Sequence, residues 1–273
     1  MEERTNQELL KEINRLTKAQ ARIKRRTTFL LSIIAMLVLI TGTLAWFTLS
    51  NFASVQEMTL QISTAPQLYL DIENHGSDIS LYKKVLTNDM INTYLTSVNA
   101  PKMEDQLLDP VTSSDGITLK NRGGDTREAN KDTYLEFKVW FIATKEMWVH
   151  LSGQTQDVEG NGNTSTTAVT TTETGAKADI VRALRLSYED SGSAAIYEPN
   201  KGSAVAGQTT FDVSQSFSND TRLFHLEKLE PKQITIRVWI EGEDPEGDDD
   251  VQGAKVNIEM LFAGTDDSNA SFE

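Results

Sequence analysis

The densest set of metal-binding groups in the chain lies near the C-terminus, in Glu241–Asp250 with the sequence EGEDPEGDDD. Calcium prefers roughly six to eight hard oxygen ligands, and a turn rich in glycine and proline can wrap carboxylates around an ion. The spacing does not match an EF-hand loop. Two interpretations stay open, a solvated acidic hairpin loop and a Ca²⁺ clip that stiffens the hairpin. The candidate calcium ligands are Glu241, Glu243, Asp244, Glu246, Asp248, Asp249 and Asp250.

The familiar catalytic sets are missing from the sequence. The histidines are His75, His150 and His225, and no His-Glu-x-x-His pair marks a zinc protease site. A Gly-x-Ser-x-Gly nucleophile motif and a phosphate-binding loop are absent as well. The chain has no cysteine, which excludes disulfides, thiolate metal ligands and lipidation on cysteine. We therefore expect that the protein is not an enzyme. We expect no cofactor either, and calcium is the one candidate ligand. A catalytic site built from distant residues is the alternative.

A long apolar segment, Phe29–Phe47, separates two parts of the chain. At about 1.5 Å per helical residue, it just spans a hydrocarbon core of ~30 Å. Basic residues at Arg22 and Lys24–Arg26 come directly before it, and the next basic residue is Lys83. By the positive-inside rule, residues 1–26 are predicted to be cytoplasmic and the C-terminal part extracellular.

The end of this segment also fits a signal-peptidase site. Thr43 and Ala45 place small side chains three and one positions before the cut, which would fall between Ala45 and Trp46. Cleavage would release the protein to the cell surface, whereas an uncleaved segment would anchor it in the cell membrane. Both outcomes stay open, and each leaves the C-terminal part outside the cell.

The residues around this site resemble a known family. The sequence GTLAWFT at Gly42–Thr48, followed shortly by Asn51–Ala53, is similar to the export signals of the TasA/camelysin group. Members of this group are surface proteins of Gram-positive bacteria, and some assemble into biofilm-matrix fibres. Farther on, Tyr134–Ile142 and Val238–Gly242 are similar in pattern to uncharacterised relatives. The resemblance implies a jelly-roll fold at the cell surface and does not indicate an activity.

Charge also differs on the two sides of the apolar segment. Residues 46–273 hold 18 of the 26 basic and 36 of the 40 acidic residues, a net charge of −18. A domain of this charge repels nucleic acid, so no nucleic-acid partner is expected. About 228 residues are enough to bury a core without disulfides.

Alternating apolar residues predict an all-β exterior part. The clearest strand is Thr133–Ile142, and Met147–Leu151 repeats the pattern after a short turn, which predicts a hairpin. Gln233–Glu241 and Lys255–Phe262 alternate as well, and Trp239 is expected to point outward. Each of these strands has apolar side chains on one face only, which favours antiparallel sheets. We therefore predict an antiparallel β-sandwich. The family resemblance narrows this fold to a jelly roll.

The exterior part should also contain one helix and two loops. Thr87 could cap a helix within Ser80–Val98. Asn99–Ala129 and Gly153–Lys177 are expected to be loops, the second a mobile one at the surface. The predicted plan has four parts: a basic helix over 1–26, a signal or transmembrane helix over 27–48, the β-sandwich over 49–264 and a flexible tail over 265–273.

Two functions from different classes fit these features. The first is a structural surface protein, a TasA-like fibre or matrix subunit, in which cleavage frees a strand that completes a sheet of the next copy. The second is a single-pass anchored binding or receptor module. The expected partners are the membrane, through residues 29–47, and further copies of this chain or other surface subunits. The candidate donor residues are Phe47, Phe52, Val55, Met58, Leu60 and Ile62.

Overall fold

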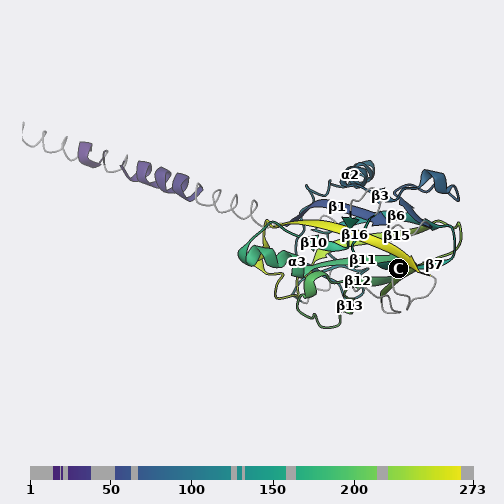
Figure 1. Ribbon diagram of the computed structural model, residues 1–273. Helices are drawn as coiled ribbons and strands as arrows, with labels where there is room; N and C mark the ends of the chain where they lie inside the picture. The colour runs from purple at the N-terminus through teal and green to yellow at the C-terminus, as the bar shows by residue number, and fades with distance from the viewer. Residues whose placement is uncertain are drawn as a thin grey trace, which may run out of the picture. The chain divides into compact units, whose positions relative to one another are not determined.

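The computed structural model describes residues 15–18, 20, 24–37, 53–62, 67–123, 128–130, 133–157, 164–213 and 221–265. The chain divides into two compact units, Met1–Ser50 and Asn51–Glu273. In the first unit, residues 24–37 form an α-helix (Figure 1). Across the described residues, no helix is both long and apolar enough to cross a membrane. The predicted sites Ala45, Trp46, Phe47 and Phe52 lie outside the described residues, as do residues 38–47 of the apolar segment.

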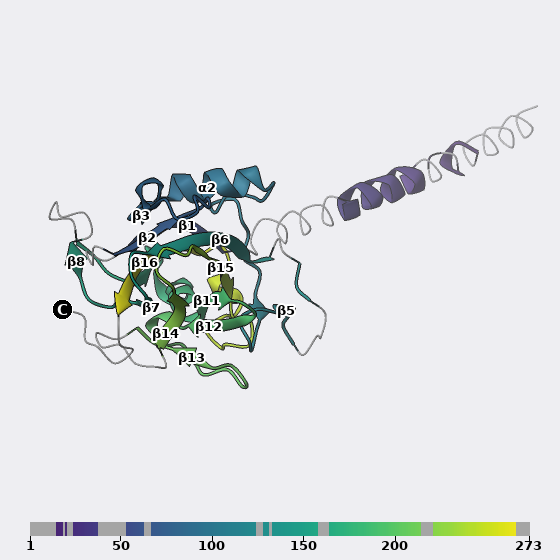
Figure 2. The same cartoon turned by 90° about the vertical axis from the view of Figure 1, so that its right-hand side faces the viewer.

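The second unit consists mostly of β-strands, which form two six-stranded sheets (Figures 1 and 2). In the first sheet the strand order is β14-β7-β16-β1-β3, and β10 pairs with β16. Its strands span Ser54–Ile62 (β1), Val85–Leu86 (β3), Met147–Leu151 (β7), Ala168–Thr170 (β10), Arg222–Leu226 (β14) and Lys255–Thr265 (β16).

The second sheet has the order β13-β12-β11-β15-β6-β2. Its strands span Leu68–Asp71 (β2), Leu135–Ala143 (β6), Leu184–Asp190 (β11), Ser193–Tyr197 (β12), Thr210–Phe211 (β13) and Lys232–Ile240 (β15). Two short pairs join Val111–Thr112 (β4) to Lys120–Asn121 (β5) and Gln156–Asp157 (β8) to Thr164–Ser165 (β9).

The longest helix of this unit, α2, spans Asn88–Ser97 and lies along the outside of the domain beside β1 and β3 (Figures 1 and 2). Thr87 is its N-cap residue, although the Thr87 side chain makes no capping hydrogen bond. Ile91 and Leu95 bury one side of α2 against the core. Further helical turns among the described residues are Ile79–Leu81 (η1), Gly175–Asp179 (η3), Ile180–Ala183 (α3), Pro199–Lys201 (η4) and Asp249–Val251 (η6).

The two sheets share one apolar core. In β6, the side chains of Leu135, Phe137, Val139 and Phe141 are buried, as the period-two alternation predicts. The ring of Phe141 lies 5.0 Å from the ring of Phe262 on β16, which belongs to the other sheet. Contacts of this kind between the sheets hold the domain together, since it has no disulfide.

The sheets are mixed, so the prediction of antiparallel sheets is wrong for two pairs of strands. β1 runs parallel to β16, from Ser54 beside Lys255 to Ile62 beside Phe262. β12 runs parallel to β13. Alternation indicates which side chains face the core, but it carries no information about the direction of the neighbouring strand.

The predicted hairpin over residues 133–151 does not form. β6 pairs with β15 and β2 in one sheet, whereas β7 pairs with β14 and β16 in the other. β15 and β16 are likewise in different sheets. The acidic segment Glu241–Asp250 therefore crosses from one sheet to the other instead of closing a hairpin, and this crossing brings some of its side chains into the interior.

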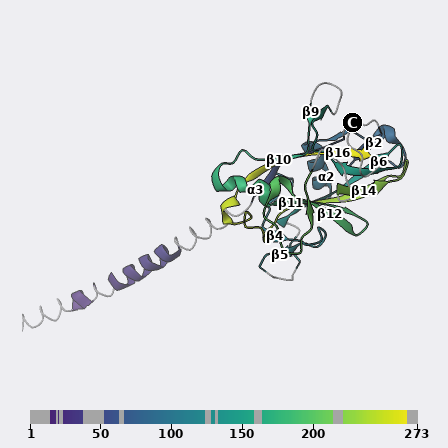
Figure 3. The same ribbon diagram turned by 60° about the horizontal axis from the view of Figure 1, so that its bottom comes forward.

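A second, smaller apolar cluster covers the other face of the β11–β15 sheet. Trp239, predicted to point outward, is fully buried in this cluster. The β4–β5 pair lies next to β11 and β12 on this side (Figure 3). The described part of Asn99–Ala129 is thus a cover that keeps this face dry, which its loop-like composition did not indicate. The other buried members of the cluster are Val111, Leu119, Tyr134 and Ile196.

The predicted surface loop Gly153–Lys177 is partly a strand. Its residues 168–170 form β10, which pairs with β16, and Val169 is 5% exposed. Threonine and valine favour strands, so this stretch can extend the sheet even though it offers little apolar area. The loop prediction is wrong for this part, and residues 158–163 lie outside the described residues.

Candidate functional site

β1 lies inside its sheet and has a neighbouring strand on each edge. It pairs with β16 at eight positions and with β3 at Leu60 and Gln61. The register with β16 shifts once, between Val55 and Glu57. The four described candidate donor residues share one buried face and are each at most 1% exposed: Val55, Met58, Leu60 and Ile62.

A strand in this position is costly to remove. Without β1, the backbone edge of β16 would lose its hydrogen-bond partners, and an apolar groove would open between β16 and β3. Burying an aliphatic side chain is favourable by about 1.5–3 kcal/mol, so burial of these four side chains stabilises the domain by a large free energy. The groove therefore needs β1 or an equivalent strand to fill it.

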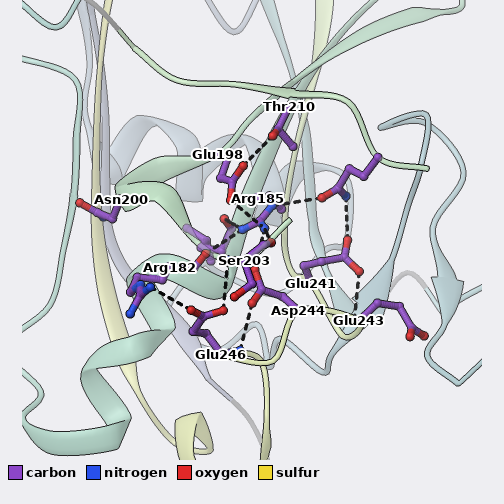
Figure 4. A network of polar contacts seen from close by, with 12 residues as sticks. Arg182, Arg185, Glu198, Asn200, Ser203, Thr210, Glu241, Glu243, Asp244 and Glu246 are labelled. Carbon is purple, nitrogen blue, oxygen red and sulfur yellow. Dashed lines mark hydrogen bonds and ion pairs between the residues drawn. The ribbon is translucent and has the colours of Figure 1, made fainter. Parts of the chain in front are cut away.

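One buried arginine, Arg185 of β11, ties the acidic segment into the domain (Figure 4). Its side chain is 0% exposed, and Nη2 lies 2.6 Å from Oδ2 of Asp244 and 3.2 Å from Oε1 of Glu198. Nη1 donates a hydrogen bond of 2.7 Å to the backbone carbonyl of Arg182. These partners compensate the guanidinium for the water it loses on burial.

Glu241 is a second buried carboxylate of the segment, and neutral groups donate to it. Trp239 Nε1 donates to Oε2 over 3.1 Å, and Gln208 Nε2 donates to the same oxygen over 2.8 Å. The backbone N–H of Glu243 donates to Oε1 over 3.2 Å. Gln208 also accepts a hydrogen bond of 3.2 Å from Nε of Arg185, so Glu241 and Arg185 belong to one network.

Asp244 and Glu246 have pKa values that are shifted in opposite directions. Burial raises the pKa of the Asp244 carboxyl to about 6, and its hydrogen bond with the Glu246 side chain adds to the rise. The same hydrogen bond is the main cause that lowers the pKa of Glu246 to about 2. Glu246 also lies 2.9 Å from Nη2 of Arg182. Asp244 is therefore the carboxyl of this pair that holds a proton first as the pH falls.

The remaining carboxylates of the segment have separate local partners. Glu243 Oε1 accepts a hydrogen bond of 2.7 Å from the backbone N–H of Gly123. Asp248 is the N-cap residue of η6 and accepts from the backbone N–H of Asp250 over 2.9 Å. Asp249 forms an exposed ion pair with an arginine of the β5 region at 3.6 Å. The acidic segment is thus fastened to the domain at several separate points.

The seven predicted calcium ligands do not converge on one point. Over the described ranges, one group of His, Asp and Glu side chains has ligand atoms that all lie within 4.8 Å of one another. That group is Glu146, His225 and Glu227, and none of these residues belongs to Glu241–Asp250. Most carboxylates of the segment accept hydrogen bonds from within the domain. Calcium binding by the segment stays a prediction.

Chelation tests that prediction. If the acidic segment holds Ca²⁺, removing the ion with EGTA should lower the melting temperature by a few degrees, because a bound ion stabilises the native state. Melting would be followed by circular dichroism with and without added Ca²⁺, and Mg²⁺ serves as the control cation. An unchanged melting temperature across these conditions would exclude the calcium clip.

A cavity of about 550 Å³ opens between α2 and the segment that follows β2. Asp71 is buried at its edge, forms an ion pair with Lys83, and lies 3.5 Å from Nε2 of His75. A few converging polar groups beside apolar walls are typical of sites for small ligands. The apolar lining consists of Ile72, Leu81, Met90 and Tyr94.

His150 of β7 is a fully buried titratable group. Its Nδ1 lies 3.0 Å from the backbone carbonyl oxygen of Thr221. Burial lowers the pKa of His150 to about 4, although the hydrogen bond at Thr221 acts in the opposite direction. A histidine of the unfolded chain binds a proton near pH 6.5, so the unfolded state gains protons first. The native state should therefore lose stability as the pH falls from about 6.5 to about 4.

Replacing His150 by glutamine should remove this slope. In the wild type, His150 should lower the free energy of unfolding by on the order of 2–3 kcal/mol across this window. The measurement is denaturant unfolding at several pH values between 4 and 7. Asp244 acts with the opposite sign, because its raised pKa favours the native state in acid. The His225→Gln variant keeps both groups and serves as the control. Equal slopes for wild type and H150Q would contradict the assignment.

No family model, no curated protein and no solved structure matches this chain. The resemblance to the TasA/camelysin group, which rests on Gly42–Thr48 and on strand patterns, therefore stays a prediction.

Sequence reasoning missed Arg185, Glu198 and Gln208 as members of a site. One signal was available, because Arg185 interrupts the apolar strand Leu184–Tyr188, and a charged side chain in such a place needs a partner. The partner Asp244 is 59 residues away in sequence, so spacing could not identify it.

Proposed function

We propose that this chain is a cell-surface structural protein, a fibre or matrix subunit that assembles by strand donation. β1 carries the proposal, since it is the N-terminal strand of the domain and fills an apolar groove between β16 and β3. The same strand from a second copy would make the same hydrogen bonds and fill the same groove. Exchange in one direction from copy to copy would then link domains into a filament.

We further infer that the domain is a β-sandwich of the jelly-roll type. Ring contacts between strands of different sheets support face-to-face packing. The ring of Phe141 lies 4.9 Å from that of Phe224, and the ring of Tyr188 lies 5.9 Å from that of Phe262. Two sheets that interdigitate side chains in this way form one core about 10 Å thick.

We place the domain outside the cell, with residues 29–47 as its export signal or membrane anchor. The described helix over residues 24–37 supports this location, because its Phe29 side chain is 67% exposed and that of Leu37 is 55% exposed. Such side chains are favourable in lipid and unfavourable in water. The acidic charge of the exterior part keeps the domain soluble and directs its interactions away from nucleic acid.

Strand donation can be tested by disulfide trapping, because the natural chain has no cysteine. Gln61 of β1 and Val85 of β3 are directly opposite one another in an antiparallel pair. One batch of protein would carry only Gln61→Cys and a second batch only Val85→Cys. After the released forms are mixed under assembly conditions and oxidised, a disulfide-linked dimer is expected if β1 of one copy enters the groove of another.

A matched pair of positions away from β1 controls for random oxidation. Glu189 of β11 and Thr235 of β15 are also opposite in an antiparallel pair, and neither belongs to the exchanged strand. Mixed Glu189→Cys and Thr235→Cys batches should give no dimer. If the Gln61 and Val85 batches give no more dimer than these controls, even in sedimented assemblies, strand donation is wrong.

The N-terminal sequence of protein recovered from the cell exterior decides between the two functions. A start at Trp46 means that residues 1–45 are an export signal, which leaves β1 on a free N-terminal segment. An intact start, with all of the protein in the membrane fraction, removes the free donor strand. The second function, an anchored binding module, would then be favoured, and the cavity beside Asp71 is the observation that supports it.

A further inference from the structure

An imidazole and two carboxylates meet at one end of the β14–β7 pair. His225 Nε2 lies 3.2 Å from Oε1 of Glu146, and His225 Nδ1 lies 3.6 Å from Oε1 of Glu227. One ligand atom from each of the three residues lies within 4.8 Å of the other two. None of these residues belongs to β1, to the buried Arg185 network or to the cavity beside Asp71.

The strand register explains why these side chains share one face. Leu226 is opposite Met147, and His225 is opposite Trp148. Glu227 follows His225 by two positions, and Glu146 precedes Trp148 by two. Because side chains alternate along a strand, all four of these side chains are expected on the same side of the pair.

The arrangement places two like charges close together. Glu146 comes directly before Met147, and Glu227 comes directly after Leu226. Both glutamates therefore lie at the same end of the paired strands. Like charges at such positions repel one another unless a cation lies between them. Their side chains are 67% and 60% exposed, so they are free to turn toward an ion from solution.

The imidazole, in contrast, is held in place. The ring of Trp148 lies 4.7 Å from the ring of His225, and the guanidinium of Arg222 lies 4.1 Å from the centre of the Trp148 ring. The His225 side chain is 24% exposed, so it is the fixed member of the group. A fixed nitrogen ligand with two adjustable carboxylates lowers the entropic cost of closing a site around an ion.

We propose that Glu146, His225 and Glu227 form a binding site for a divalent transition-metal ion of the zinc type. An imidazole nitrogen with two carboxylate oxygens suits Zn²⁺ and its neighbours better than Ca²⁺ or Mg²⁺, which prefer oxygen ligands alone. Two ligand atoms at about 2.0–2.1 Å from zinc in a tetrahedral site are separated by about 3.3 Å. One ion binds only one of the two ring nitrogens. Through Nε2, the Glu146 oxygen at 3.2 Å already lies near this separation, whereas the exposed Glu227 side chain, 3.6 Å from Nδ1, must turn toward Nε2.

The bound ion would fasten the end of β14 to β7. β14 is the edge strand of its sheet and pairs with β7 in the strand order, and just after it the backbone N–H of Leu229 donates to the carbonyl of Ala143 over 2.8 Å. The ion would add a second attachment at this end, through the side chains. Three protein ligands leave at least one position of the ion for water. The site adds a cation-dependent brace to the domain and goes beyond strand donation, which does not require it.

The test uses the untagged full chain, with Zn²⁺ as the probe. Titration calorimetry should give one Zn²⁺ per chain, and a Zn²⁺ concentration near 100 times Kd should raise the melting temperature by on the order of 5 °C. H225A should lose both responses, and so should the double variant E146Q/E227Q, which keeps the Trp148 contact with His225. H75A removes a histidine elsewhere in the domain and should keep both responses.

Two results would overturn the proposal. One is the absence of Zn²⁺ binding by the wild-type chain up to millimolar concentration. The other is an equal melting shift in the wild type and in E146Q/E227Q, which would place the ion elsewhere. The shift is independent of assembly, so its loss and a failure of disulfide trapping at Gln61 and Val85 can be told apart.

Discussion

Replacing Arg185 by methionine should lower the free energy of unfolding by about 3–5 kcal/mol at pH 8. The Arg185 side chain is fully buried between Asp244 at 2.6 Å and Glu198 at 3.2 Å. Methionine fills much of the same volume but leaves both carboxylates without their cation. Asp244, whose side chain is 0% exposed, must then remain charged in a dry environment or take up a proton, and both alternatives cost free energy. Denaturant unfolding followed by circular dichroism measures the loss.

Arg182 provides the control for this prediction. It pairs with Glu246 at 2.9 Å, but its side chain is 45% exposed, so water already screens the pair. Arg182→Met should therefore cost no more than about 1 kcal/mol. Equal losses for the two variants would mean that burial of Arg185 is not what makes it important.

The loss caused by R185M should also depend on pH. The pKa of Asp244 is already raised to about 6 by burial, and removing the cation should raise it further. A protonated Asp244 needs no cation, and the variant takes up this proton at a higher pH than the wild type. The difference in unfolding free energy should therefore shrink as the pH falls from 8 toward about 6 and level off at lower pH. A loss that stays constant from pH 8 to pH 4 would contradict the role given to Asp244.

The strands themselves could be predicted, because their alternation is local. The apolar residues of β1, β6, β15 and β16 face the core as the sequence indicates. The partners of these strands could not be predicted. Gln61 of β1 and Glu259 of β16 are hydrogen-bonded but 198 residues apart in sequence, and alternation is the same for every partner.

The second buried face explains two further errors. Trp239 and Arg185 lie on the face of the sheet opposite to the main core, where an antiparallel sheet usually meets water. Here residues such as Val111 and Leu119 cover it, although they come from a segment with the composition of a loop. A cover of this kind has no periodic signal, so the sequence indicated one dry face where the domain has two.

The acidic segment shows how composition can suggest the wrong partner. Seven carboxylates in ten residues suggest a metal ion when the segment is considered alone. In the structure, Asp244 pairs with the arginine of β11, and Glu246 pairs with the arginine of α3. Glu241 accepts hydrogen bonds from Trp239 and Gln208. Those partners become visible only when the fold brings distant segments together.

Replacing Leu60 by alanine should lower the free energy of unfolding by about 2–5 kcal/mol. Leu60 is 0% exposed near the C-terminal end of β1, beside Met260 of β16 and Leu86 of β3. Truncation removes apolar contact area and leaves a cavity, because strands fixed on both sides cannot close around the gap. Thermal and denaturant unfolding of the domain measure the change.

The neighbouring residue Thr59 serves as the control, since its side chain points to the other face of β1 and is only partly buried. Thr59→Val keeps the branched shape and should change the free energy of unfolding by no more than about 0.5 kcal/mol. If strand donation is correct, Leu60 fills the same groove in the assembly as in the single domain. L60A should then also weaken assembled filaments, with dissociation at lower denaturant concentration than for T59V. Filaments of L60A as resistant as those of T59V would mean that β1 is not the strand that joins the copies.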